Sequence, residues 1–151
     1  MTKFFTALLI STLTFAGTTA TLNLKGTVGA VVDIAVVAEG DSESLDLSAG
    51  VTNKKVGTVT EKSNSNVGYK VAVSSTNNGN LKHANNDVFA YSLTYGGEAA
   101  DLANGGKTFN RATTGVSVQT KDVNVTYSGK SAASMVSGAY SDVVTFTITA
   151  N

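Results

Sequence analysis

Residues 21–36 read TLNLKGTVGAVVDIAV, and this stretch decides the fold. Apolar or small residues occupy every second position from Leu22 to Val36, which is the period of a β-strand with one buried face. Fully extended, those 15 positions would span about 50 Å, whereas a domain of about 130 residues has a radius of gyration near 14 Å. We therefore expect the run to bend, to switch sheets or to leave the domain. Gly26 and Gly29 are its natural hinges.

If the run leaves the domain, residues 21–28 form an alternating apolar arm. Such an arm is able to pair with the sheet edge of a neighbouring molecule, which is a general route to fibres. The same segment is also able to complete the sheet of its own domain. The sequence leaves both pairings open.

The rest of the chain also alternates with period two. The alternation is clear over 69–73, 89–95, 123–127 and 144–148, and turn signals separate these runs at 77–80, 96–97, 104–106, 128–129 and 137–138. This pattern predicts seven to nine strands in an antiparallel sandwich. A change of parity at Lys121-Asp122 predicts a bulge or bend there. Two short segments, Glu98 to Ala103 and Lys130 to Met135, are candidates for single helical turns.

Residues 1–20 have the layout of a secretory signal peptide. Lys3 gives a positive start, an apolar run extends from Phe4 to Phe15, and Thr18 and Ala20 are small residues before a cleavage site. The apolar run is too short to cross a bilayer, which needs about 20 apolar residues. We therefore expect an exported protein with one domain, residues 21–151, and no membrane span in the mature chain.

Composition excludes several classes of function. The chain has no Cys, one His and equal numbers of basic and acidic residues, 11 of each. Without Cys there is no disulfide, thiolate metal site or thiol nucleophile. A nucleic-acid partner is not expected, because such proteins carry a basic face. These features favour a binding or structural protein that is not an enzyme and holds no cofactor.

The residues that could carry chemistry are few. His83 lies in a polar loop pattern, where a solvated histidine is the simpler interpretation. Glu39, Asp41, Glu43 and Asp46 supply oxygen ligands, so Glu39, Asp41 and Glu43 are weak candidates for a calcium site, with a solvated acidic turn as the alternative. Residues 105–108, GGKT, lack the upstream glycine of a phosphate loop and indicate a turn.

Both ends of the mature chain resemble a known family. Leu24-Lys25-Gly26-Thr27-Val28, followed by Val31-Val32-Asp33-Ile34, is similar to the opening strand of bacterial chaperone–usher pilins. Residues 138–149, GAYSDVVTFTIT, resemble their last strand and are closer still to that of spore-coat-U-like subunits. Gly138 is the fourteenth residue from the end, where pilins commonly carry a glycine. The middle of the chain matches only as a general strand pattern.

The resemblance implies an incomplete immunoglobulin-like Greek-key sandwich that lacks its last strand and is completed by donor-strand exchange. It implies that other copies of the chain or related subunits are the partners, helped by a periplasmic chaperone and an outer-membrane usher. The protein would then pass through the periplasm to a cell-surface fibre that serves cell adhesion. The donor residues would be Leu22, Leu24, Gly26 and Val28. The acceptor edge would be the strand from Ala139 to Ala150, with Gly138, Tyr140, Val144, Phe146 and Ile148 at the interface.

The chain departs from the pilin pattern in three ways. It has no cysteine pair, its penultimate residue is Ala150 rather than an aromatic, and only five residues of the mature chain precede Gly26. A short arm favours the alternative of a self-contained secreted sandwich that binds carbohydrate or a surface protein through its loops. The sequence does not distinguish a pilin from a coat protein.

Overall fold

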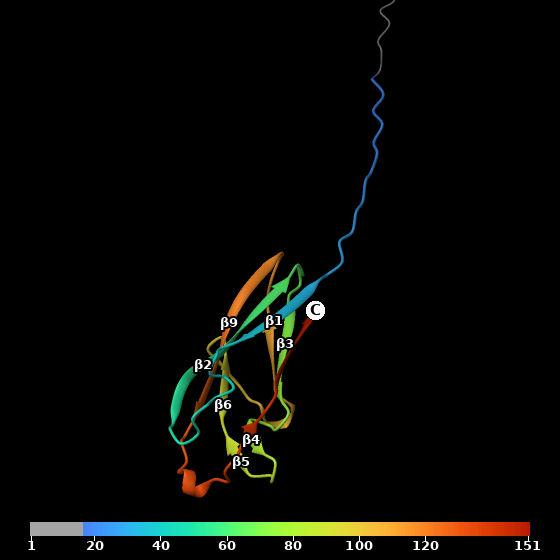
Figure 1. The fold of residues 1–151 in the computed structure, drawn as a ribbon. Helices are drawn as coiled ribbons and strands as arrows, with labels where there is room; N and C mark the ends of the chain where they lie inside the picture. Colours follow the sequence, from blue (N-terminus) through green and yellow to red (C-terminus); the bar gives the residue numbers. More distant parts are fainter. Residues whose placement is uncertain (1–16) are drawn as a thin grey trace, which may run out of the picture.

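The structure is a computed structural model that describes residues 17–151. Residues 1–16, most of the predicted signal peptide, lie outside the described residues. Within the described part the chain forms eleven strands and two 3-10 turns (Figure 1). The strands are β1 (Val32–Ala38), β2 (Val51–Ser63), β3 (Tyr69–Ser75), β4 (Asn80–His83), β5 (Val88–Ala90), β6 (Ser92–Tyr95), β7 (Glu98–Ala100), β8 (Lys107–Arg111), β9 (Ser117–Tyr127), β10 (Tyr140–Ser141) and β11 (Val144–Ala150), and the turns are η1 (Ala103–Gly105) and η2 (Ala132–Ser134).

The strands form two facing layers and one small sheet. The large sheet has the order β1-β2-β9-β6-β7, the facing sheet β11-β3-β8, and the small sheet β10-β4-β5. Every pair of neighbouring strands is antiparallel. The predicted all-β antiparallel sandwich is therefore confirmed, while its immunoglobulin-like connectivity stays a prediction. The small sheet lies at the lower end of the layers in Figure 1.

The core lies between the two layers and follows the alternation of the sequence. Tyr69, Val71 and Val73 of β3 point inward, opposite Val123, Val125 and Tyr127 of β9. Aromatic rings interlock there: the rings of Phe89 and Tyr127 meet edge to face with centroids 5.3 Å apart, and those of Tyr95 and Phe109 do so at 5.2 Å. Such pairs add about 0.5–1.5 kcal/mol to the area that they bury.

One charged side chain is fully buried in this core. The carboxylate of Glu61 on β2 accepts hydrogen bonds from the hydroxyls of Tyr69 and Tyr95, and the guanidinium of Arg111 lies 3.4 Å away. Burial raises the pKa of both tyrosines above its usual value, and the bond to the carboxylate adds to the shift. Because these donors satisfy Glu61, the charge is tolerated between the layers.

Three details of the sequence-based prediction were wrong. The strand count is higher than seven to nine because short strands such as β5, β7 and β10 join the long ones. Residues 98–100 form β7 rather than a helical turn, since they pair with β6, whereas η2 does lie within the second predicted turn. Val116 and Val118 face solvent, and the pairing of β9 with β2 is regular at Lys121. The two register shifts between these strands lie on β2, between Val51 and Lys54 and between Lys55 and Gly57.

Candidate functional site

The segment before β1 leaves the domain. Residues 17–31 belong to no strand and run away from the upper end of the sandwich (Figure 1). Leu22, Leu24 and Val28 are 83%, 87% and 87% exposed. A run of exposed apolar side chains on an extended backbone is costly in water and indicates an interaction site.

The root of this segment is held at one point. The side chain of Asn64, just after β2, accepts a hydrogen bond from the Val31 amide at 2.6 Å and donates one to the Gly29 carbonyl at 3.1 Å. The Asn64 amide in turn donates to the Val31 carbonyl. These contacts fix where residues 29–31 leave the domain, close to the end of β11 in Figure 1.

The two long edges of the sandwich differ. On one edge, side chains of β8 reach across to β7: Arg111 pairs with the Glu98 carboxylate at 3.2 Å, and the Lys107 ammonium donates to the Ala99 carbonyl at 2.7 Å. On the other edge lie β1 and β11. Within the described residues β1 pairs only with β2 and β11 only with β3, so both strands present unpaired backbone groups.

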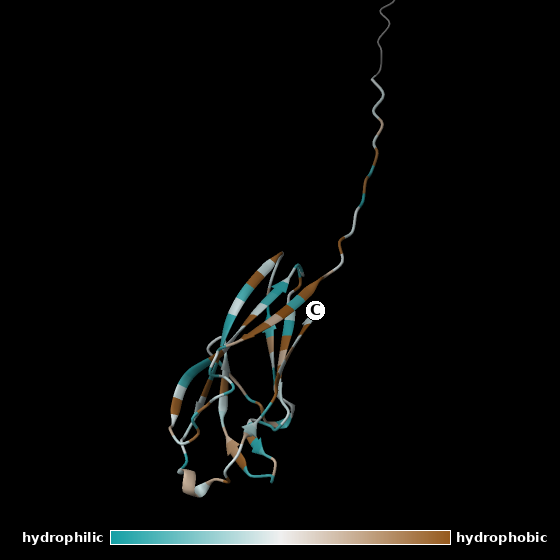
Figure 2. Ribbon diagram, in the orientation of Figure 1, coloured by the Kyte–Doolittle hydropathy of each residue, from teal (hydrophilic) through white to brown (hydrophobic). Residues whose placement is uncertain are grey.

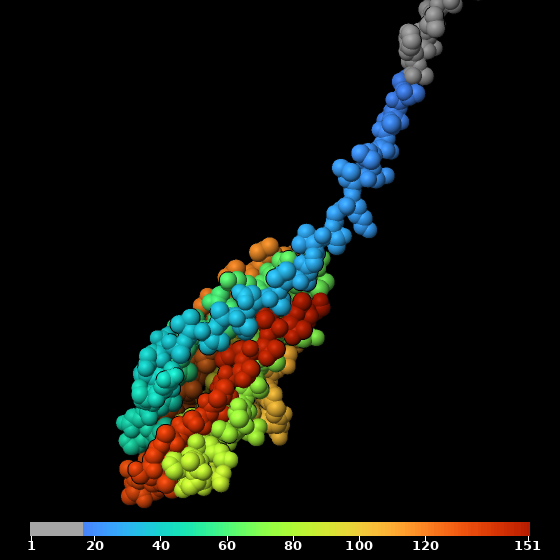
Figure 3. Space-filling view, turned by 45° about the vertical axis from the view of Figure 1, so that its right-hand side comes forward, coloured from blue at the N-terminus to red at the C-terminus, as the bar shows by residue number. Residues whose placement is uncertain are grey.

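An open groove lies along the edge of β1 and β11. Figure 3 shows the hollow between the band of β1 and residues 39–50 and the red band of the C-terminal strand. It has a volume of about 390 Å³ and an apolar lining that includes Val36, Leu45, Val56, Tyr91, Val144 and Phe146. Val144, Phe146 and Ile148 alternate inward along β11 and remain half-buried, because nothing in the domain covers them. We call this feature the edge groove.

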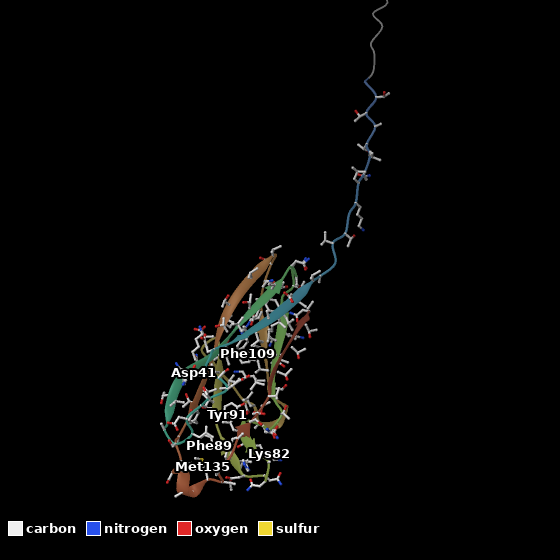
Figure 4. The ribbon with its side chains drawn as sticks, viewed as in Figure 1. Asp41, Lys82, Phe89, Tyr91, Phe109 and Met135 are labelled. Carbon is white, nitrogen blue, oxygen red and sulfur yellow. The ribbon has the colours of Figure 1, made fainter. Side chains whose placement is uncertain are left out.

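Two aspartates anchor the lower part of the C-terminal segment, around β10 and the start of β11. The Asp142 carboxylate accepts hydrogen bonds from the Tyr91 hydroxyl at 2.7 Å, the Ser75 hydroxyl at 2.5 Å and the Asn77 amide at 3.0 Å. The Tyr91 ring lies in the wall of the edge groove (Figure 4). Burial raises the pKa of Tyr91, and the bond to the Asp142 carboxylate adds to the shift.

The second aspartate, Asp87, binds the segment that precedes β10. Its carboxylate accepts hydrogen bonds from the Tyr140 hydroxyl and from the Val136 amide. The bond from Tyr140 holds the pKa of Asp87 below its usual value and raises that of Tyr140. Since β10 has only two paired residues, these side-chain bonds supply much of what positions residues 136–143.

A second hollow, of about 750 Å³, continues the edge groove at the lower end of the molecule. It lies between residues 42–48 and residues 132–142. Leu45, Leu47, Leu81 and Met135 form its apolar part, with serine hydroxyls around them. Figure 4 shows Met135 near the lower tip, below Phe89 and Tyr91. We call this feature the lower hollow.

The predicted interface residues fall into two groups. Leu22, Leu24, Gly26 and Val28 lie on the free segment, whereas Val144 and Phe146 line the edge groove and Ile148 is half-buried farther along β11. Gly138 and Tyr140 line the lower hollow instead. Gly138 has a φ of +142°, and a Cβ there would lie 2.4 Å from Nε2 of His83, so the glycine makes room for the imidazole.

Sequence reasoning missed Tyr91, Leu45, Leu47 and Asp142 as part of the site. Leu45 and Leu47 alternate with Asp46, which is the signal that could have placed one face of that segment against the groove. Asp142 carried no local signal, because its partners lie 51 to 67 residues away.

The acidic side chains of residues 39–46 do not converge. The Asp41 carboxylate lies 2.6 Å from the Lys54 ammonium, and this hydrogen bond holds the pKa of Asp41 below its usual value. Glu39 lies 3.4 Å from Lys55, and Asp46 accepts hydrogen bonds from Ser48. In residues 17–151 no group of three or more Asp, Glu or His side chains is arranged to hold a metal ion.

The other residues considered for chemistry, His83 and the GGKT turn, make contacts that support the fold. The His83 imidazole bonds to the side chain of Asn85 at 2.6 Å and packs against the Tyr140 ring. Gly106, in the GGKT turn, has a φ of +90°, and a Cβ there would lie 2.1 Å from the Val73 carbonyl oxygen. That glycine is needed for the close approach of two strands.

No protein-family model matches the chain, and no curated protein matches it. The described part of the chain holds no helix that is both long enough and apolar enough to cross a membrane.

Proposed function

We propose that the protein is a structural subunit of an exported bacterial surface fibre or coat, assembled when the arm of one subunit, residues 21–28, enters the edge groove of the next. The observation that carries the proposal is the pairing of two incomplete features in one chain. The arm exposes alternate apolar residues, and the edge groove opens beside β1 and β11, two edge strands that are not hydrogen-bonded to each other.

The shapes of donor and acceptor agree. An inserted strand presents every second side chain to the groove. In the arm these are Leu22, Leu24, Gly26 and Val28, whereas the single charged residue, Lys25, has the opposite parity and would face solvent. An arm of eight residues is about 26 Å long, which is long enough to pair with the part of β11 that lines the groove, Val144 to Phe146.

The direction of insertion decides the kind of assembly. Since β1 and β11 run in opposite directions (Figure 1), an inserted strand is parallel to one and antiparallel to the other. An arm antiparallel to β11 enters at the upper end of the groove and leaves at the lower end, so subunits follow one another head to tail and form an open fibre. An arm parallel to β11 belongs either to the same molecule, after a turn at residues 29–31, or to a closed pair. Each orientation forms one antiparallel and one parallel pair, so the type of pairing does not choose between them, and the test below does.

The test compares the exported chain with a variant that lacks residues 21–28. Both are run on a detergent gel with and without boiling. A heat-sensitive ladder that disappears on deletion supports strand addition between molecules. A soluble monomer that unfolds on deletion means instead that the arm completes its own sheet, and the loops then become the place to look for a ligand.

A protease provides an independent readout. Lys25 is the only basic residue between positions 17 and 31, so trypsin has one site in the arm. We expect cleavage after Lys25 in the free subunit and protection in the ladder, since a strand paired on both sides does not fit a protease. Equal cleavage in both states would contradict the proposal.

A further inference from the structure

The upper end of the molecule carries apolar side chains that nothing in the domain covers. Val31, Val67 and Val116 are 64%, 63% and 87% exposed. They come from the root of the arm, the loop between β2 and β3, and the loop between β8 and β9. We call these three residues the valine tip. Figure 2 shows brown segments at the upper ends of β1 and β9.

Strand register brings part of this tip together. Val32, Ser63 and Ser117 lie in one row across β1, β2 and β9. The next row outward contains Val31 and Val116, because Asn64 hydrogen-bonds to Val31 and follows Ser63 directly. About two strand spacings of 4.8 Å separate the backbones of Val31 and Val116, so both exposed side chains lie at the same end of the large sheet.

The opposite end carries a concave apolar surface. The lower hollow exposes Leu45, Leu47, Met135 and Val136 at the point where the edge groove ends. It lies beyond the last residues of β11 that an arm antiparallel to that strand would pair with. The molecule therefore has an apolar projection at one end and an apolar hollow at the other.

The covalent link between arm and domain brings these two surfaces together. From Val28 to Val32 the chain has four residue steps, which span at most about 14 Å. When Val28 lies near the start of β11, the domain that follows it begins within that distance of residues 140–144. These residues border the lower hollow. The valine tip of the donor subunit lies at the same end of its domain as Val32, so it is placed to meet the hollow.

We propose that the valine tip of each subunit packs into the lower hollow of the subunit whose edge groove holds its arm. The occupant is thus a second copy of this chain, and the inference rests on the proposed function. The contact is heterologous, since a projection at one end fits a hollow at the other, and it repeats without closing. It would turn a flexible link between domains into a fixed angle along the fibre.

The absence of cysteine from the sequence allows a direct test by disulfide cross-linking. The full chain carrying both Val116→Cys and Val136→Cys is exported, allowed to assemble and oxidised. Both positions are exposed, and Val116 directly precedes the upper end of β9 while Val136 lines the lower hollow, so a disulfide forms only between molecules. We expect the heat-sensitive ladder to become resistant to boiling and sensitive to reductant.

The control pairs Val116→Cys with Thr120→Cys, which is exposed in the middle of β9 and far from the lower hollow. A second measurement follows the thiol of Val136→Cys alone. Assembly should slow its reaction with a thiol reagent, and the further changes Val67→Asp and Val116→Asp should restore the rate while the ladder persists.

The outcomes separate the two proposals. A normal ladder with no more cross-linking than in the control overturns the packing of tip on hollow and leaves strand addition standing. A variant that carries Val116→Cys as its only cysteine gives the third outcome. If it forms cross-linked pairs, the valine tips of two subunits contact each other, which overturns the inference and reverses the direction of the arm. Absence of any ladder in the unsubstituted chain defeats the proposed function and the inference with it.

Discussion

Replacement of Leu24 by Asp in the arm tests strand addition with a matched control in the neighbouring residue. Leu24 is 87% exposed and does not contact the domain, so Leu24→Asp should change the free energy of unfolding of the subunit by less than about 0.5 kcal/mol. In the edge groove the same change is costly. It forfeits about 1.5–3 kcal/mol from burial of a leucine and places a carboxylate among apolar side chains without a partner, which costs at least about as much again.

A loss of 3 kcal/mol or more corresponds to a fall of more than about 100-fold in the association constant between arm and groove. The assay is the unboiled gel ladder, and thermal unfolding of the subunit serves as the stability measurement. Asn23→Asp adds the same charge at the adjacent position, where the side chain has the opposite parity and faces solvent. We expect Leu24→Asp, and likewise Leu22→Asp, to abolish the ladder while Asn23→Asp preserves it. A normal ladder from Leu24→Asp, or equal loss in both charge variants, would refute the argument from alternate faces.

Three further predictions concern the domain itself. Glu61→Ala should lower the free energy of unfolding by about 3–5 kcal/mol, because it leaves the hydroxyls of Tyr69 and Tyr95 without an acceptor in the core and removes one of the two carboxylates beside the Arg111 guanidinium. Chemical denaturation measures this, and a loss below about 1 kcal/mol would show that the buried carboxylate is not needed. Alkali should destabilise the fold, because the folded-state pKa values of Tyr69 and Tyr95 lie above the usual 10. Their contribution to the free energy of unfolding is complete below pH 10. It is lost as the pH rises further, by about 1.4 kcal/mol per pH unit for each tyrosine. A urea midpoint that stays constant from pH 9 to pH 11.5 would contradict this. Phe146→Ala should cost the isolated subunit less than the 3–5 kcal/mol of a fully buried ring, because Phe146 is half-buried there, and it should weaken the assembled ladder further; equal destabilisation of both states would show that the ring does not face the arm.

The alternating residues made the class of fold predictable. Tyr69, Val71 and Val73 were assigned to one buried face, and the structure buries all three completely. The alternating run that begins at Leu22 was predicted to bend, to switch sheets or to leave the domain. It leaves the domain at residues 29–31, and only its later part, from Val32, belongs to β1. What the sequence could not supply was the pairing of strands distant in the chain. The neighbours β1 and β11 of the edge groove are separated by more than 100 residues, and no local pattern encodes their proximity.

The parity change near Lys121 shows why local pattern misleads at an exposed end of a strand. Val116 and Val118 have the parity that faces away from the core, and apolar residues at such positions look like a shift in register. Local pattern was equally uninformative about the two aspartates that anchor the C-terminal segment. Asp87 and Asp142 were indistinguishable from solvated turn residues until the structure placed tyrosine hydroxyls against them. Buried or half-buried polar contacts over long sequence separations depend on tertiary structure, which composition and spacing do not report.

The contrast between the two long edges of the sandwich bears on how assembly is kept specific. Unpaired edges invite association, and proteins guard them with charge. The edge of β7 and β8 is guarded in this way, since Lys107, Arg111 and Glu98 lie across it. The outward residues of β11, in contrast, are three threonines, 145, 147 and 149, and no charge opposes an incoming strand there. An edge that is free of charge and lies above an apolar groove would be a liability in a monomer that remained alone. The same chain carries an exposed arm with the complementary alternation, so each feature supplies what the other lacks. Placing a charge on the unguarded edge tests this argument. Thr147→Lys on β11 should change the free energy of unfolding of the subunit by less than about 0.5 kcal/mol, because the side chain is exposed, and should weaken the ladder. Asn110→Lys on the outward face of β8 should change neither the stability nor the ladder. An unaffected ladder in Thr147→Lys would mean that charge beside the edge groove does not influence entry of the arm.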